Sequence, residues 1–534
     1  MALTERFRGM TVASALANRA TTDPDVPFLR HRDDVLSLGQ VESRSEALAA
    51  ALAGLGIEAG DRVALVLPAW PEFVVSLFAI AKLGAVVVPL DPRLTRPELQ
   101  YMLRHSRAVA AVSAEELNGV DFLQLFEEIL VELPELHYVV TVGEEDLWYD
   151  DRIFQFEDLL SAGGGRDYSA PAQDPAEDLF AILYTSGTTG KPKGVELTHS
   201  NILHAAAGTA EAVGLGEGDR VVGVTALFHV FGIGPGILGS LLAGATLILQ
   251  DSPGAHETLD LIEKHRVTVH YGVPTLFVTE LQELDRRRRD VSSLRVGVAA
   301  GAPVAADLVD RVERELCPRL LVAYSLTETA STISMTGPGD SQDVRSFTVG
   351  RPIPGTEIRI VDPNHWTELP VESVGEIAVR GPGVMKGYYR QPRETAHCFD
   401  DEGFFLTGDL GMVDEEGYVY LVGRRKDVII RGGSNVYPRE VEDRLQSHPA
   451  VHDAVVVGVP DDVLGEATCA CIVPVEGAIV TEDEIRDWCA VTLADYKVPD
   501  RVRFMDDFPL TGTGKVRRVE LSRLMRDARA GRQQ

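Results

Sequence analysis

A run of hydroxyl residues, glycines and lysines from Thr185 to Lys193 has the groups that bind a polyphosphate. It follows an apolar run, Leu179 to Leu183, that is typical of a buried strand. Glycines let backbone N–H groups approach a phosphate, hydroxyls donate hydrogen bonds, and lysines supply positive charge. The residue types and their order therefore predict a phosphate-binding loop. Its candidate contacts are Thr185, Ser186, Gly187, Thr188, Thr189, Gly190 and Lys193.

The spacing of this loop differs from the Walker A pattern, which has four residues between its first glycine and its Gly-Lys pair. Here Gly187 and Gly190 enclose two residues, and Pro192 follows Lys191. Because proline lacks an N–H and fixes φ, we expect the loop not to run directly into a helix. A surface turn rich in Gly, Ser and Thr is the plainer alternative.

Two acids follow predicted strands, a place where parallel sheets often bind ligands. Glu328 lies in Tyr-Ser-Leu-Thr-Glu-Thr, residues 324–329. Its carboxylate and the nearby hydroxyls suit Mg²⁺, a hard cation that shares its shell with phosphate oxygens. Asp409 lies in Thr-Gly-Asp-Leu-Gly, residues 407–411, and a carboxylate there can accept both hydroxyls of a ribose. A solvated strand-end acid and an ordinary turn are the respective alternatives.

A lysine and a histidine also have surroundings that favour chemistry. Lys515 ends the turn Thr-Gly-Thr-Gly-Lys, and a mobile ammonium can bridge a carboxylate and a phosphate as negative charge builds between them. His229 lies in the apolar segment Leu-Phe-His-Val-Phe-Gly, residues 227–232, where a histidine is more often a satisfied core residue. Each signal is weak when it is taken alone.

In type, order and spacing, these motifs resemble those of the AMP-forming adenylating enzymes. That superfamily contains acyl-CoA synthetases, peptide-synthetase adenylation domains and firefly luciferase. The motifs span residues 184–515, which is most of the chain, and within the superfamily they are most like those of fatty-acid–CoA ligases. One departure is Ser325, where the family's Tyr-Gly-x-Thr-Glu motif has glycine.

The resemblance implies roles for the residues of the nucleotide site. The loop from Thr185 to Lys193 would hold the β- and γ-phosphates of ATP, and Thr185 and Glu328 would bind Mg²⁺. The ribose would contact Asp409 and Arg424. The implied adenine contacts are Gly301, Ala302, Pro303 and Tyr324, and Thr327 is implied as a further contact of the cofactor.

The resemblance also implies roles outside the nucleotide. Lys515 would stabilise the first transition state, and His229 would lie at the mouth of the acyl pocket. Lys426 would be the hinge between two domains. Gly432 and Gly433 would line the tunnel for the pantetheine arm of coenzyme A. The implied catalytic set is Lys515, Glu328, His229 and Thr185.

The implied reaction is attack of a carboxylate on the α-phosphate of ATP, giving acyl-AMP and pyrophosphate, followed by transfer of the acyl group to CoA. The uncharged, glycine-rich segment 230–242 favours a medium- or long-chain fatty acid as substrate. Alternatives are an aryl-CoA ligase similar to coumarate or benzoate ligases, and a fatty acyl-AMP ligase that loads a carrier protein. An amino-acid-activating domain is disfavoured because residues 221–250 contain no acid, and a nucleotide-sensing module would not need Lys515.

The composition limits the partners of the chain. Its net charge of −30 disfavours nucleic acids and anionic membrane surfaces as ligands. Five cysteines form no Cys-x-x-Cys pair, which favours reduced thiols in the cytoplasm. The first twenty residues lack the apolar core of a secretory signal, and the charge-free segment 221–250 is interrupted by glycines and a proline, so we expect no membrane span. The oligomeric state stays open, with a homodimer as one alternative.

The pattern of apolar runs predicts an α/β fold in more than one domain, since 534 residues exceed a single core. Strand and helix patterns alternate to about residue 325, which indicates parallel sheet with crossover helices. Short β-rich runs follow, and then a compact α+β module. With the resemblance, this predicts a large N-terminal domain (1–423) of two α/β subdomains and a β-rich one, a hinge (424–431), and a small mobile C-terminal domain (432–534).

Overall fold

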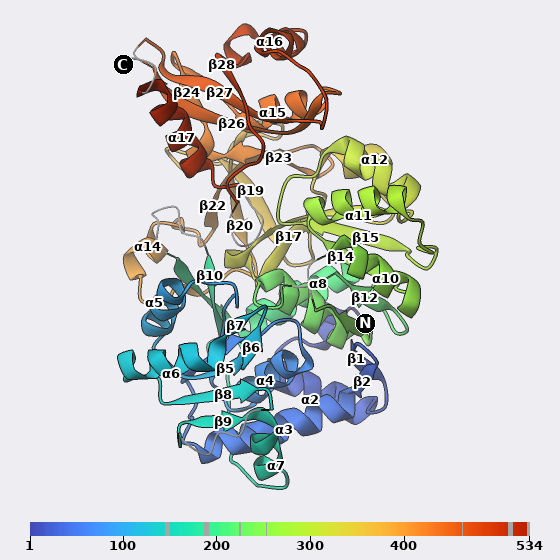
Figure 1. Ribbon diagram of the computed structural model, residues 1–534, viewed down its shortest axis with the longest axis vertical. Helices are drawn as coiled ribbons and strands as arrows, with labels where there is room; N and C mark the ends of the chain where they lie inside the picture. Colours follow the sequence, from blue (N-terminus) through green and yellow to red (C-terminus); the bar gives the residue numbers. More distant parts are fainter. Residues whose placement is uncertain are drawn as a thin grey trace. The chain divides into compact units, whose positions relative to one another are not determined.

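The computed structural model describes residues 1–144, 150–185, 192–223, 226–251, 254–461, 463–510 and 516–530, with side chains to residue 525. The chain forms two compact units (Figure 1). Unit 1 comprises Met1–Glu357 and Val379–Phe405, and unit 2 comprises Ile358–Ala378 and Leu406–Gln534.

Unit 1 contains a sheet of nine strands in the order β18-β17-β16-β15-β14-β12-β13-β1-β2. Its central strands are parallel, whereas β2, β17 and β18 pair antiparallel at the two edges. The strands are β1 (Pro27–His31), β2 (Asp34–Ser37), β12 (Arg220–Val222), β13 (Thr246–Leu249), β14 (Val269–Gly272), β15 (Val296–Ala300), β16 (Leu320–Leu326), β17 (Ser331–Met335) and β18 (Arg351–Pro352).

A second sheet of unit 1 has eight strands in the order β21-β11-β10-β4-β3-β5-β8-β9. It is parallel from β10 to β9, but β10 and β11 form an antiparallel hairpin and β21 adds antiparallel to β11. The strands are β3 (Arg62–Val66), β4 (Val86–Pro89), β5 (Ala108–Ala114), β8 (Tyr138–Val142), β9 (Ile153–Gln155), β10 (Leu179–Thr185), β11 (Lys193–Thr198) and β21 (Gly387–Tyr388). A separate small pair is β6 (Glu116–Leu117) and β7 (Val120–Asp121).

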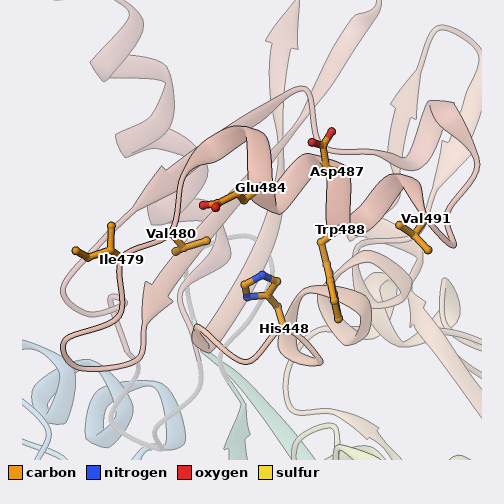
Figure 2. A pocket seen from close by; sticks show the side chains of 7 residues that line it. All are labelled: His448, Ile479, Val480, Glu484, Asp487, Trp488 and Val491. Carbon is orange, nitrogen blue, oxygen red and sulfur yellow. The ribbon is translucent and has the colours of Figure 1, made fainter.

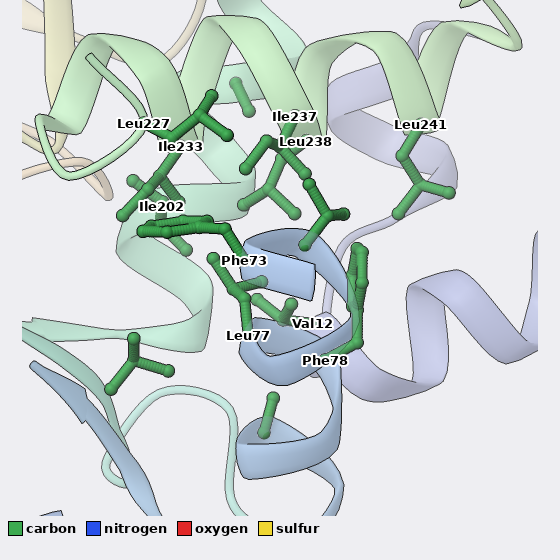
Figure 3. Packing of buried hydrophobic residues seen from close by; sticks show 14 of the residues in the cluster. Val12, Phe73, Leu77, Phe78, Ile202, Leu227, Ile233, Ile237, Leu238 and Leu241 are labelled. Carbon is green, nitrogen blue, oxygen red and sulfur yellow. The ribbon is translucent and has the colours of Figure 1, made fainter. Parts of the chain in front are cut away.

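One apolar core joins both sheets to the helices α2, α3, α4, α8 and α9. In Figure 3, Phe73, Leu77 and Phe78 of α4 face Ile237 and Leu241 across this core. Helix α4 is buried from Phe73 to Lys82, and the ammonium of Lys82 is paired with Glu42 and Glu46. The helical segments of unit 1 are α1 (Leu3–Arg6), α2 (Val12–Thr22), α3 (Leu38–Gly54), α4 (Pro71–Lys82), α5 (Arg96–Ser106), α6 (Phe122–Glu132), α7 (Phe156–Gly163), α8 (His199–Val213), η1 (Gly232–Leu238), α9 (Gly239–Ala243), α10 (Ala255–His265), α11 (Pro274–Arg286), α12 (Ala306–Glu315), η2 (Thr327–Thr329), α13 (Gln342–Phe347) and α14 (Pro392–Ala396).

The charge-free segment 221–250 folds inside this core. It contributes β12, the π-helix η1, helix α9 and β13, and all residues of η1 and α9 are buried. The sequence predicts here a strand (Val221–Ala226), a ligand-facing loop, a small-residue helix and a strand (Ala245–Leu249). The two strands and the helix are present, but the first strand ends at Val222, and the contact of the loop with a ligand stays a prediction. Across the described part of the chain, no helix is both long enough and apolar enough to span a bilayer.

Unit 2 is built on two smaller sheets. A four-stranded sheet has the order β19-β20-β22-β23, and a five-stranded sheet has the order β25-β24-β27-β26, with β28 parallel to β27. Separate apolar clusters pack on the two faces of the second sheet, one of them including α15 and α16 and the other Leu521 of α17. The elements are β19 (Glu357–Val361), β20 (Gly375–Arg380), β22 (Phe405–Val413), β23 (Val419–Arg424), η3 (Arg425–Asp427), β24 (Ile429–Arg431), β25 (Ser434–Val436), α15 (Pro438–Gln446), β26 (Val451–Asp461), β27 (Gly465–Pro474), α16 (Glu482–Ala490), η4 (Asp495–Lys497), β28 (Arg501–Phe504) and α17 (Arg518–Ala530).

The predicted fold class, a large α/β region with a small α+β C-terminal module, is confirmed. One predicted element is too long, because α16 ends at Ala490, whereas the pattern predicted a helix to Ala494. Val491 and Thr492, two β-branched residues of low helix propensity, follow the observed end. The predicted domain boundary at residue 423 and the hinge from 424 to 431 stay predictions.

Candidate active site

The predicted phosphate loop closes an antiparallel hairpin. Thr185, the last residue of β10, is the direct cross-strand partner of Lys193, the first residue of β11. This confirms that the loop does not run directly into a helix, as Pro192 indicated. The intervening candidates Ser186, Gly187, Thr188, Thr189 and Gly190 lie outside the described residues.

Tyr388 connects this hairpin to the predicted metal ligand. Its hydroxyl donates a hydrogen bond to Oε1 of Glu328 at 2.9 Å, and the Nζ of Lys193 lies over its ring, 4.4 Å from the centroid. Strand β21 places it there, because Tyr388 pairs with Val195 of β11. Burial, and after it the charge of Glu328, raises the pKa of Tyr388, so its hydroxyl stays a donor at neutral pH. A tyrosine in this role was not predicted from the sequence.

Glu328 is suited to a hard cation. It lies in the short helix η2, directly after β16, and its side chain is half-buried. Tyr388 occupies one carboxylate oxygen, and no described residue donates a hydrogen bond to the other. No group of three or more His, Cys, Asp or Glu side chains that could hold a metal ion gathers within the described ranges.

The predicted adenine segment lies beside Tyr324. Gly301, Ala302 and Pro303 follow β15, and Ala300 of β15 pairs with Ala323 of the parallel strand β16. The two segments therefore end side by side at one edge of the nine-stranded sheet. Gly301 has a φ of +85°, where glycine is favoured. The buried Thr327 follows two residues after Ser325.

The substitution of serine for glycine at Ser325 is compatible with the backbone. The φ of Ser325 is not positive, so this position does not require glycine. The pairing of β16 with β17 shifts register between Tyr324 and Ser325, so a local irregularity lies at this substitution.

A cluster of aromatic side chains supports the base of the hairpin. His105 of α5 shares a 2.8 Å hydrogen bond with the hydroxyl of Tyr184 in β10. Tyr101 stacks on His105, and Tyr389 meets the edge of the same imidazole. The backbone N–H of Tyr389 donates to the carbonyl of Gly194 at 2.7 Å, so both hairpin strands are held.

His229 lies three residues before the π-helix η1. Its carbonyl accepts hydrogen bonds from the N–H groups of Gly232 and Ile233, and its Nδ1 accepts one from the N–H of Phe231 at 3.3 Å. The ring of Phe231 lies 5.5 Å from that of Tyr271 in β14. His229 is half-buried, at the boundary between the fully buried η1 and the site. Its predicted role at the acyl pocket stays a prediction.

In unit 2, the predicted ribose pair is formed. Asp409 and Arg424 are direct partners in the antiparallel pair of β22 and β23, and Asp409 Oδ1 lies 3.0 Å from Arg424 Nε. Asp409 is 6% exposed. The left-handed φ of +73° at Gly408 forms the turn before it, and Gly408 donates its N–H to Glu376 at 3.0 Å.

Glu376 is a supporting residue that sequence reasoning missed. Its carboxylate is buried, and it accepts a 3.1 Å ion-pair contact from Arg425 Nη1 besides the bond from Gly408. Burial raises its pKa. The signal in the sequence was an acid inside the strand Gly375–Arg380, whose neighbours Ile377, Ala378 and Val379 are apolar.

The remaining predicted residues of unit 2 fall in three places. Lys426 lies exposed in the short helix η3. Gly432 and Gly433 have φ values of +56° and +85° and form the two-residue turn between β24 and β25, a turn in which both central residues require positive φ. Lys515 lies outside the described residues.

A shallow depression of about 390 Å³ in unit 2 contains none of the predicted site residues. Figure 2 shows Trp488 and Asp487 of α16 on one side and His448 below Glu484. The rings of His448 and Trp488 meet edge to face at 5.0 Å. This depression therefore shares no residue with the predicted active site.

Two family models match the chain. One, described as AMP-binding enzyme, matches residues 16–389, and the other, AMP-binding enzyme C-terminal domain, matches residues 440–515. The chain is 35% identical to "Putative acyl-CoA synthetase YngI" of Bacillus subtilis over 96% of each chain. It is 35% identical to "Feruloyl-CoA synthase" of an Amycolatopsis species, over 97% of this chain and 99% of that one. It is 33% identical to "Medium-chain acyl-CoA ligase ACSF2, mitochondrial" of Danio rerio, over 89% of this chain and 81% of that one.

Solved structures agree with these relatives. The anthranilate CoA ligase AuaEII, in complex with anthranoyl-AMP, superposes with a TM-score of 0.89 at 28% identity and covers 98% of each chain. The two matched models cover most of this chain, and its fold and its full-length relatives are those of CoA ligases. The chain belongs to the AMP-binding enzyme family and is an AMP-forming acyl-CoA ligase that uses ATP, Mg²⁺ and coenzyme A.

Proposed function

We propose that this ligase activates a medium- or long-chain fatty acid. The observation that carries this proposal is the buried segment from η1 to α9, which follows His229 and offers an incoming acid no charged side chain. Its apolar side chains, such as Ile233, Ile237 and Leu241, are 0% exposed. These side chains pack into the core, and an acyl pocket beside so apolar a segment would favour an alkyl chain, because each buried methylene contributes about 0.8 kcal/mol.

The assignment of residues to the reaction is part of this proposal. Thr185 and Lys193 bind the outer phosphates, Glu328 and Thr185 hold Mg²⁺, and Tyr388 fixes the carboxylate of Glu328. The metal, when bound, neutralises phosphate charge. The acid's carboxylate attacks the α-phosphate and pyrophosphate leaves, with Lys515 stabilising the charge that develops.

The second half of the reaction uses unit 2 in the same proposal. Asp409 and Arg424 keep the ribose of the acyl-AMP in place. The thiol of CoA then attacks the acyl carbon and AMP leaves. Gly432 and Gly433 line the path of the pantetheine arm because a turn without side chains leaves room for it.

An aryl acid is the second candidate, and one observation favours it. The hydroxyl of Tyr271 is buried and makes no hydrogen bond to any described residue, although its ring contacts Phe231 near the site. A buried hydroxyl without a partner is costly, and a polar substituent on an aromatic ring would satisfy it. The names of two relatives represent the two kinds of acid, because one is a medium-chain acyl-CoA ligase and the other a feruloyl-CoA synthase.

A panel of acids separates the two candidates. We expect kcat/KM, followed by pyrophosphate release with and without CoA, to rise about fourfold per added methylene from C4 until the pocket is filled. Tyr271→Phe should leave that series unchanged. Highest activity on hydroxycinnamic acids, lost in Tyr271→Phe, would reverse the assignment, and product formation only with a carrier protein would show a different acceptor.

A further inference from the structure

A depression of about 330 Å³ lies on unit 1, lined by the end of α5 and by the segment after α6. Figure 1 shows where these two helices lie. Its wall is partly apolar, formed by Leu103, Ala108, Leu133, Pro134 and Leu136. Its charged lining consists of three arginines, Arg104, Arg107 and Arg390, and one acid, Glu135. The lining therefore carries an excess of positive charge, although the chain as a whole has a net charge of −30.

The three arginines are not neutralised within the described part of the chain. No acid there lies within ion-pair distance of any of their guanidinium groups, whereas Arg96, two turns earlier on α5, pairs with both Glu128 and Glu132 of α6. The same helix pair therefore has a neutralised end and a positively charged end. An unpaired group of guanidiniums around a concave surface is an anion-binding arrangement.

Two of these arginines occupy backbone positions that disfavour them. Arg107 ends α5 with a φ of 54°, and Arg390 has a φ of 57°. A left-handed residue with a side chain costs about 1 kcal/mol or more, so glycine or asparagine would be the stable choice. At both positions the backbone directs a long cationic side chain to the same depression.

Two arginines of the depression are the chain neighbours of residues that support the predicted phosphate hairpin. Arg390 follows Tyr389, whose N–H bonds to Gly194 and whose hydroxyl donates to the carbonyl of Ser106 at 3.4 Å. Arg104 precedes His105, the partner of Tyr184. Burial lowers the pKa of His105, and the charge of Arg390 lowers it further.

We propose that Arg104, Arg107 and Arg390 form a second anion site, which binds the phosphate group of a small metabolite. Guanidinium groups bind phosphate oxygens through paired hydrogen bonds, and the volume suits a ligand of the size of pyrophosphate or a nucleoside monophosphate. Both products of the reaction, pyrophosphate and AMP, have this chemistry. A ligand there would contact Arg104 and Arg390, the chain neighbours of His105 and Tyr389, and through them would act on the hairpin that holds the nucleotide.

Calorimetric titration tests the site with two probes, pyrophosphate and AMP. The full chain is first saturated with a non-hydrolysable acyl-sulfamoyl adenosine, which fills the acyl and AMP positions of the catalytic site. Each probe is then titrated at low salt into the unaltered protein, into the triple variant R104Q/R107Q/R390Q, and into the control R96Q, which removes a paired arginine of the same helix. ATP–pyrophosphate exchange, measured without the inhibitor, reports whether each variant is folded.

We expect at least one probe to bind the unaltered protein and R96Q, and to bind the triple variant about tenfold more weakly or with one site fewer. The probe that shows the difference identifies the source of the phosphate. Equal binding of both probes to the triple variant, or no binding beyond the catalytic site in the unaltered protein, would overturn the proposal. If the triple variant does not fold, R390Q alone is compared with R96Q under the same criteria.

Discussion

At the scale of single residues, Tyr388 couples two motifs that are far apart in the sequence. Its hydroxyl binds Glu328 and its ring lies under Lys193, so the predicted metal ligand and a predicted phosphate contact depend on one side chain. It is 8% exposed, so water does not easily replace the hydroxyl. Without Tyr388, the carboxylate of Glu328 would lose the only partner that the described residues provide.

We therefore predict that Tyr388→Phe weakens the use of Mg²⁺. A hydrogen bond to a charged group contributes about 1.5–3 kcal/mol, so the Mg²⁺ concentration that gives half-maximal adenylation should rise about tenfold or more. The ring over which Lys193 lies is kept. Tyr388→Leu removes the ring as well and should lose more, through a higher KM for ATP.

Tyr389→Phe is the matched control for this prediction. It removes the neighbouring hydroxyl, which bonds only to the backbone at 3.4 Å, and should leave the Mg²⁺ dependence unchanged. The measurement is pyrophosphate release at varied Mg²⁺ and fixed ATP. An identical Mg²⁺ dependence in Tyr388→Phe and the unaltered protein would show that Tyr388 has no part in holding the metal ligand.

Asp409→Ala should raise the KM for ATP by about tenfold or more, with a smaller change in kcat. The substitution removes an acceptor of the ribose and leaves Arg424 without its 3.0 Å partner. Because the two side chains contact each other, the double variant with Arg424→Ala should lose less than the sum of the single losses. An unchanged KM would show that Asp409 serves only the turn.

At the scale of elements, the sequence predicted most strands and helices but not how the strands pair. The pattern from Arg62 to Val112 gave the alternation of β3, α4, β4, α5 and β5. Strand β11 was not predicted, because Lys193 and Gly194 belong to the loop motif and obscure the alternation. The pairing of β21 with β11 joins residues nearly two hundred positions apart, and no local pattern encodes it. That pairing is what brings Tyr388 to Glu328.

The π-helix η1 is a second feature that the spacing of apolar residues in the sequence could not predict. Its seven residues include Pro235, and a sequence pattern with a period of 3.6 does not distinguish such a segment from an α-helix. Its glycines allow close packing. A Cβ atom added at Gly232 would lie 2.3 Å from the carbonyl oxygen of Ala226 and 2.8 Å from Cα of Leu227.

Gly232→Ala should therefore destabilise unit 1 by about 1–3 kcal/mol, because the atoms that it meets are backbone and cannot rotate away. Gly239→Ala is the control. Its Cβ would have 3.6 Å to the nearest atom, so it should be neutral or stabilise the helix by up to about 1 kcal/mol. The midpoint of thermal unfolding checks both. Equal midpoints would show that η1 can shift to accept a side chain.

At the scale of the whole molecule, the resemblance predicted a function that no single motif could. The order of the motifs from residue 184 to 515 specified the family, and the matches at residues 16–389 and 440–515 agree with it. The substrate could not be predicted as well. The pocket that we propose would be formed by residues from several elements, such as Phe231 and Tyr271, whose contact depends on the folded sheet.

The last prediction concerns Lys426, the residue that the family resemblance assigns to the hinge. It lies in the short 3₁₀ turn η3, where φ values between about −50° and −70° are usual, and proline fixes φ near −65°. Lys426→Pro should therefore keep the local conformation described here and prevent any other. If acyl-AMP and thioester form in different domain arrangements, this variant separates the two half-reactions. We expect ATP–pyrophosphate exchange to survive within about threefold and thioester formation to fall by at least about tenfold.

Lys515→Ala is the matched variant with the opposite expected effect. Its ammonium is needed only where charge develops on the α-phosphate, so its removal should lower the rate of adenylation but not the rate of transfer of preformed acyl-AMP to CoA. Both rates are measured in the same preparation of each variant. Normal rates of both half-reactions in Lys426→Pro would exclude a hinge at this residue.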